Sequence, residues 1–198
     1  MSWGVSRLRA LGVTLAMLAG LLATAIATGR QAAAADPAVV YMSQVGRELM
    51  AAARSQSPSM IAQVIQKHGD IGFIALSALG NYRKRLTDAD KPEYIAGTAR
   101  FMARYAASKA PEYQVSKVEW ANETVRGGRG TYVDCTVTLR DGSSYDVRWL
   151  VYKVGSGYKV RDATVLGFSM TDQMKTMFEN YVSENGGNVR ALTAVLNR

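Results

Sequence analysis

The sequence predicts an α+β domain in which helices pack on a four-stranded antiparallel meander sheet. Three observations predict it. Apolar residues recur at helical spacing after residue 35, they alternate with polar residues between 114 and 166, and helical spacing returns after residue 170. Helices, then strands joined by short turns, then helices again is the order of an α+β plan, not of an alternating α/β one.

Length and composition indicate a single folded domain. The chain has 198 residues, of which 48% are apolar and 20% charged. Its one cysteine and one histidine exclude an internal disulfide framework and a Cys/His zinc cluster. The net charge of +8 suits an acidic partner, but the basic residues are not interleaved with aromatic residues, so nucleic acid is not an expected partner.

Residues 1–35 have the features of a secretory signal. Arg7 and Arg9 precede an uncharged apolar run over residues 10–27, and Ala33–Ala35 supplies the small residues of a cleavage site. We expect cleavage near Ala35 and export of residues 36–198 as one domain. An uncleaved anchor is the alternative, because the apolar run is just long enough to span a bilayer.

Two helices are expected to open the domain. Apolar residues follow Asp36-Pro37 near helical spacing as far as Ala53. Ser57-Pro58 is a favourable start for the second helix, with proline at the first helical position, and His68-Gly69 ends it. At a helix end, His68 is expected to have a capping or surface role.

Two more helices are expected before the strands. One begins at Asp70 and ends in the basic cluster Arg83–Arg85, which suits the negative end of a helix dipole. The next begins at the capping sequence Thr87–Asp90 and runs to about Ala110, where Pro111 stops it.

The middle of the chain alternates as strands do. Arg126–Gly130 is expected to be a hairpin loop rather than a phosphate-binding loop, because it lacks the ending of a P-loop and lies between strands. Asp141-Gly142 is a hairpin turn signal. Because the links are short, the strands are expected to be antiparallel. The expected strands are residues 114–120, Tyr132–Leu139, Tyr145–Val154 and Tyr158–Leu166.

The chemically reactive side chains of these strands follow the same alternation. Cys135 falls on the apolar face and is expected to be a buried hydrophobe rather than a nucleophile. Asp134 and Asp146 fall on the polar face, where an acid–base pair is conceivable although nothing fixes their separation.

The chain is expected to close with two helices, Thr171–Asn185 and Asn188–Asn197. Met170, Met174 and Met177 recur at i, i+4 and i+7 on one face. Methionine adapts to varied apolar shapes, so this stripe is either an ordinary core face or a binding surface.

Three stretches of the sequence resemble the MlaC family, also called the toluene-tolerance family of ABC-transporter auxiliary proteins. They are Leu79–Arg83, Tyr158–Asp162 and Val165–Ser169, in the order of that family. One departure is Gln173–Lys175, which stands where the family usually has a Tyr-Arg pair.

The resemblance implies a function and a fold. It implies a periplasmic phospholipid carrier that moves lipid between an outer-membrane lipoprotein complex and an inner-membrane ABC transporter. It also implies a fold like nuclear transport factor two, opened into an apolar cavity that holds the lipid tails. On this basis we expect a monomer that is not an enzyme and has no cofactor besides bound phospholipid.

Strand parity and helix phase then give candidate lining residues between the sheet and the helices. Arg83–Arg85 are further candidates for contact with anionic head groups or with a membrane partner. The sheet candidates are Val133, Cys135, Val137, Val147, Trp149 and Val151, and the helix candidates are Ile74, Leu79, Met102, Tyr105, Met170, Met174 and Phe178.

Three alternatives remain open from the sequence. A relative that handles hopanoids or other polycyclic lipids would have the same sequence features. An isomerase-like enzyme would need an acid inside the apolar cavity, for which Asp134 or Asp162 are candidates. An interaction module would have a filled core in place of a cavity.

Overall fold

The computed structural model describes residues 35–198, so the expected secretory signal lies outside the described residues except for Ala35. No helix among the described residues is long and apolar enough to cross a membrane. The helices are α1 (Pro37–Arg54), α2 (Pro58–His68), α3 (Ile71–Ala78), the 3₁₀ helix η1 (Gly80–Arg85), α4 (Lys91–Lys109), α5 (Met170–Glu184) and α6 (Val189–Leu196). The strands are β1 (Val115–Gly127), β2 (Gly130–Leu139), β3 (Ser144–Val154), β4 (Gly157–Val165) and β5 (Phe168–Ser169).

The antiparallel meander is confirmed, with the strands in the order β1-β2-β3-β4-β5. The sheet has five strands, and the prediction of four was wrong. The additional strand, β5, contains only Phe168 and Ser169, which pair with Val165 and Thr164. Two residues are too few to produce an alternating pattern, so the sequence carries no signal for this strand.

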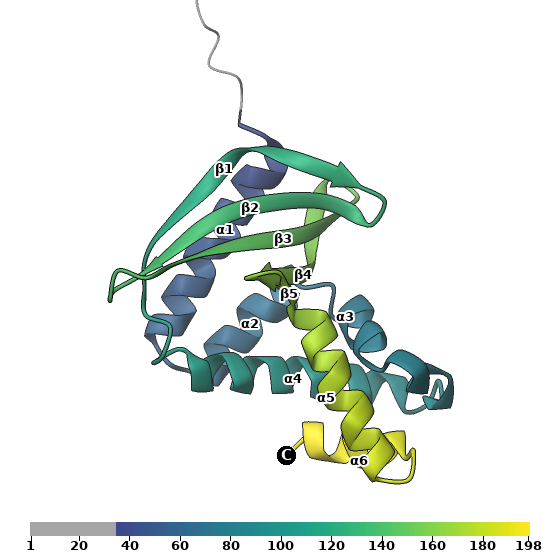
Figure 1. Cartoon of the computed structure of the whole chain (residues 1–198). Coiled ribbons are helices and arrows are strands. Elements are labelled where there is room, and N and C mark those ends of the chain that lie inside the picture. The colour runs from purple at the N-terminus through teal and green to yellow at the C-terminus, as the bar shows by residue number, and fades with distance from the viewer. Residues whose placement is uncertain (1–34) are drawn as a thin grey trace, which may run out of the picture. The chain divides into compact units, whose positions relative to one another are not determined.

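Helix α1 covers the apolar face of the sheet, and Figure 1 shows it crossing behind the strands. Met42 and Val45 of α1 form a buried cluster with Val133 of β2 and Val151 of β3. Gly46 gives Trp120 room to approach, since a Cβ there would lie 2.8 Å from the indole ring. Helix α1 therefore covers the apolar face of the sheet, which would otherwise be exposed to water.

A second core lies among the other helices, with α4 and α5 crossing below the sheet (Figure 1). Tyr94 of α4 is fully buried in it and donates a 2.8 Å hydrogen bond to the carbonyl oxygen of Ala75. Burial raises the pKa of the Tyr94 phenol above its ordinary value. A smaller cluster around Ile61 and Ala103 joins α2 to α4.

Two helix boundaries differ from the sequence prediction. The third helix does not continue to Arg85, because Gly80 has φ +51° and the chain tightens there into the 3₁₀ turn. A left-handed residue ends an α-helix and is tolerated by glycine at little steric cost. The fourth helix begins at Lys91, and Thr87 instead accepts a hydrogen bond from the Asp90 backbone N–H in a preceding turn.

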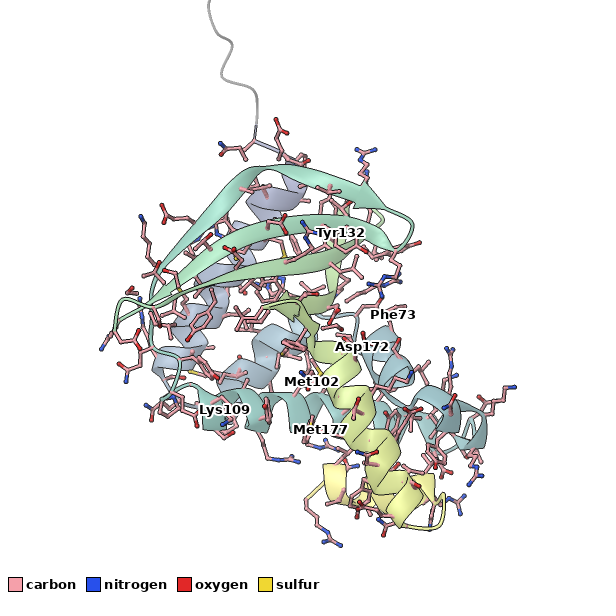
Figure 2. All side chains as sticks on the ribbon, in the orientation of Figure 1. Phe73, Met102, Lys109, Tyr132, Asp172 and Met177 are labelled. Carbon is pink, nitrogen blue, oxygen red and sulfur yellow. The ribbon has the colours of Figure 1, made fainter. Side chains whose placement is uncertain are left out.

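Strand β4 is tied to the junction of α2 and α3 by polar contacts that we call the strap. The Asp70 backbone N–H donates to the carbonyl oxygen of Val160, and Arg161 Nε lies 2.9 Å from an Asp70 carboxylate oxygen. The Arg161 guanidinium also lies over the rings of Phe73 and Tyr152, at 4.3 and 3.6 Å from their centroids. The strap thus connects the sheet to the helical layer, and Figure 2 labels Phe73 at this place.

His68 is buried, and the expectation of a surface role was wrong. Its Nε2 lies 2.9 Å from a Glu48 carboxylate oxygen and its Nδ1 lies 3.1 Å from the Tyr41 hydroxyl. Both ring nitrogens therefore have partners. Hydrogen bonds from Lys67 and then from His68 lower the pKa of Glu48 to about 2.

Candidate functional site

An open, mostly apolar pocket lies between α4, α5 and α6 and has a volume of about 490 Å³. Ligand pockets commonly measure about 300–1,000 Å³, so this one has the size of a small-molecule site. Its wall includes Phe101, which stacks on Tyr105 at 6.0 Å and meets Phe178 edge-on at 5.4 Å. The lining residues are Phe101, Arg104, Tyr105, Ser108, Met177, Phe178, Tyr181, Leu192, Val195 and Leu196.

This helical pocket, as we call it, leaves large apolar side chains open to solvent. Tyr105 is 49% exposed and Met177 is 43% exposed, on neighbouring helices. Among the polar lining residues, Arg104 donates from Nη2 to the carbonyl oxygen of Leu196, and Ser108 donates to the carbonyl oxygen of Tyr105. A mostly apolar wall that contains one arginine is suited to an amphiphile rather than to a polar substrate.

A second pocket of about 380 Å³ lies where the ends of α1 and α4 meet the start of β1 and the end of β2. Its wall is mixed, with apolar side chains facing two arginines. We call it the end pocket, and its lining residues are Leu49, Met50, Ala53, Arg54, Gln56, Ala110, Pro111, Tyr113, Gln114, Val115 and Arg140.

Most of the predicted helix residues lie in the helical core. Ile74, Leu79, Met174 and Phe178 are buried there, and Met102 packs against the same cluster. Figure 2 labels Met102 and Met177 close to the crossing of α4 and α5. Of the predicted set, the structure brings Tyr105 and Phe178 together at the helical pocket. Met170 is 40% exposed at the start of α5 and lines neither pocket.

The predicted sheet residues lie on one face, as strand parity requires. Val133 pairs with Trp149 and Cys135 pairs with Val147 across β2 and β3. Val133 and Val151 are in the core with α1, Trp149 packs against that core, and Val137 is half-buried. None of these residues lines either pocket, because α1 packs on the part of the sheet where the sequence reasoning expected open space.

Sequence reasoning missed several lining residues of the helical pocket. Met177 and Tyr181 belong to the apolar stripe of α5, but periodicity does not separate them from their buried neighbour Met174. The sequence does not identify Arg104 as a lining residue, because an arginine on an amphipathic helix is expected on the solvent-exposed face. Spacing identifies an apolar face but not which of its members meet an open space.

The two carboxylates considered for an enzyme have different surroundings. The Arg148 guanidinium, 2.7 Å away, holds the pKa of Asp134 below its ordinary value, so that carboxyl is ionised at neutral pH. Asp162 is buried and accepts a 3.0 Å hydrogen bond from the Thr171 backbone N–H at the start of α5. Cys135 is buried as predicted, and burial raises the pKa of its thiol.

One comparison with known proteins identifies a family, and another shows a shared fold. The family model described as "MlaC protein" matches residues 41–198. Among solved structures, this chain is similar to the phospholipid-binding protein from Ralstonia solanacearum in complex with a phospholipid, with a TM-score of 0.65 and 20% sequence identity. The match covers 83% of this chain and 96% of that one, and it shows a shared fold. A search of curated proteins found no match.

Proposed function

The chain belongs to the MlaC family, and from this we propose that it binds a phospholipid and carries it, with the tails shielded from water. The observation that carries the proposal is the helical pocket, where Tyr105 and Met177 are left exposed beside a cavity of about 490 Å³. Exposed apolar side chains that gather at one pocket are typical of a ligand-binding groove. The similar protein from Ralstonia solanacearum, described as phospholipid-binding, lends support to the ligand class.

The energetics of acyl chains explain why a carrier is needed. Burying one methylene group is worth about 0.8 kcal/mol, so a chain of about sixteen carbons gains on the order of 12 kcal/mol on leaving water. We propose that acyl chain atoms occupy the helical pocket, against Tyr105 and Phe178. A role for the other predicted lining residues stays a prediction.

We further propose where the protein acts. The basic, apolar and small-residue segments of residues 1–35 favour export to the periplasm. There the carrier is proposed to exchange lipid with an inner-membrane ABC transporter and an outer-membrane lipoprotein complex. No enzymatic step and no cofactor are part of this proposal.

Native mass spectrometry followed by organic extraction tests the proposal. We expect a bound phospholipid in the purified protein, or uptake of phospholipid from vesicles if it is purified empty. Recovery of a polycyclic lipid instead would favour the hopanoid-handling alternative. A protein that neither retains nor takes up any lipid would contradict a carrier function.

Paired surface variants test the proposed pocket. Met177→Lys places a charge at its wall and is expected to reduce bound lipid, with little effect on folding because Met177 is 43% exposed. Met60→Lys is the matched control, since Met60 is 45% exposed on α2 and lines neither pocket. Equal lipid content in the two variants would show that the lipid tails do not bind in the helical pocket.

A further inference from the structure

We propose that the end pocket is a separate binding site for an oxyanion, a phosphate or carboxylate, carried on a short apolar body. None of the thirteen predicted lining residues lines this pocket, and it shares no residue with the helical pocket. The inference therefore goes beyond the proposed carrier function and stands on this pocket alone.

The charged residues that line the pocket are of one sign. Arg54, at the end of α1, and Arg140, just after β2, both line it, and no aspartate or glutamate does. Among residues 35–198, neither guanidinium forms an ion pair, although Arg140 Nη1 donates to the Gln114 side chain at 3.3 Å. Two arginines that line one pocket without an ion pair attract an oxyanion, which is the acceptor that a guanidinium binds best.

The nearest carboxylates in the sequence do not compete for these arginines. Glu112 accepts hydrogen bonds from Lys109 at 2.9 and 3.0 Å. Asp141 accepts from the backbone N–H and hydroxyl of Ser143. Among residues 35–198, neither carboxylate forms an ion pair with Arg54 or Arg140, so both guanidinium groups can still bind a ligand.

The rest of the wall determines what must be attached to the oxyanion. Leu49, Met50 and Ala53 of α1 face the pocket, together with Pro111 and Val115. A cavity of about 380 Å³ with this wall is larger than an inorganic anion needs, and it favours an apolar group beside the charge. Both arginines are themselves exposed to solvent, so the apolar group of the ligand, rather than the anion, is the part that the pocket would cover.

Octyl phosphate and octanoate are suitable soluble probes. Octanol, which has only the apolar group, and inorganic phosphate, which has only the anion, are the two half-ligands used as controls. We expect calorimetry on the full chain to show saturable binding of the two amphiphilic anions that is tighter than binding of either half-ligand. The affinity should fall as salt is added, because the arginines are exposed to screening. Octanol binding as tightly as octyl phosphate would overturn the proposal.

Three single variants locate the probe. Arg54→Gln and Arg140→Gln are each expected to weaken octyl phosphate binding about tenfold, the loss of one charge-assisted hydrogen bond. Arg47→Gln is the matched control, since Arg47 is exposed on the same helix, donates only to Ser43, and does not line the pocket. Equal affinities in Arg54→Gln and Arg47→Gln would also overturn the proposal.

Filling the pocket gives a test that leaves the charges in place. Ala53→Phe is expected to abolish octyl phosphate binding while the unfolding temperature changes little. Unchanged binding in this variant would place the probe elsewhere.

Vesicles with and without phosphatidylglycerol then identify the source of the anion. If the protein binds the anionic vesicles and Arg54→Gln weakens this binding, the anion is a lipid head group. If the protein binds octyl phosphate but not the anionic vesicles, the ligand is a free amphiphile.

Discussion

At the scale of single residues, the Glu48 side chain of α1 contacts Lys67 and His68 of α2. It accepts hydrogen bonds from Lys67 and lies 2.9 Å from His68 Nε2, and these contacts stabilise its ionised form. They lower its pKa from 4.5 to about 2. The stabilisation is therefore fully present above pH 4.5 and is lost as the pH falls through about 2.

This linkage predicts how Glu48→Gln behaves. At pH 7 the variant should have a lower free energy of unfolding than the wild type, and the difference should shrink between about pH 4.5 and about pH 2. Urea unfolding across this range measures it. Glu123→Gln on β1 is the control, since Glu123 makes no ion pair among residues 35–198. A difference that stays constant with pH would show that the Glu48 contacts do not form in solution.

At the scale of elements, the boundary between α3 and η1 depends on one glycine. Gly80→Ala would hold alanine at φ +51° and push its Cβ into the Glu179 carboxylate, which accepts a 2.8 Å hydrogen bond from the Asn81 backbone N–H. The left-handed conformation alone costs about 1–2 kcal/mol. We expect a fall of about 2–8 °C in the unfolding temperature.

Gly72→Ala is the matched comparison, because Gly72 lies in the first turn of α3 and a Cβ there meets nothing within 4 Å. Alanine in a helix interior is about 0.5–1 kcal/mol more favourable than glycine. The two variants should therefore shift the unfolding temperature in opposite directions. Shifts of the same sign would contradict the left-handed turn at Gly80.

Elements were easier to predict from the sequence than the site. Cys135 and Asp134 fall on the faces that alternation assigned to them, because side chains in a strand alternate whatever lies beyond the sheet. Met174 and Met177 show the limit. They lie on one helical stripe, yet Met174 is 6% exposed and Met177 is 43% exposed. Met174 packs in the helical core and Met177 lines the helical pocket, a difference that depends on tertiary packing and not on local spacing.

At the scale of the whole molecule, Cys135 reports on opening of the sheet. It is 5% exposed on β2, which is paired to strands on both sides, and its pKa is raised by burial. We expect a thiol reagent to label it slowly in buffer and rapidly in urea. A cysteine introduced by Val154→Cys, at a position that is 52% exposed, is the fast-reacting control. Equal labelling rates in buffer would show that the sheet opens without global unfolding.

The strap has a consequence for the order in which the chain folds. Hairpins of the meander join residues close in sequence, whereas the bond between Asp70 and Arg161 spans 91 residues. Closing a long loop costs conformational entropy that only later contacts repay. We therefore expect hairpins and helices to form early, with the strap closing near the end. Until the strap closes, the sheet and the helical layer are only partly packed, and their apolar faces are exposed to water.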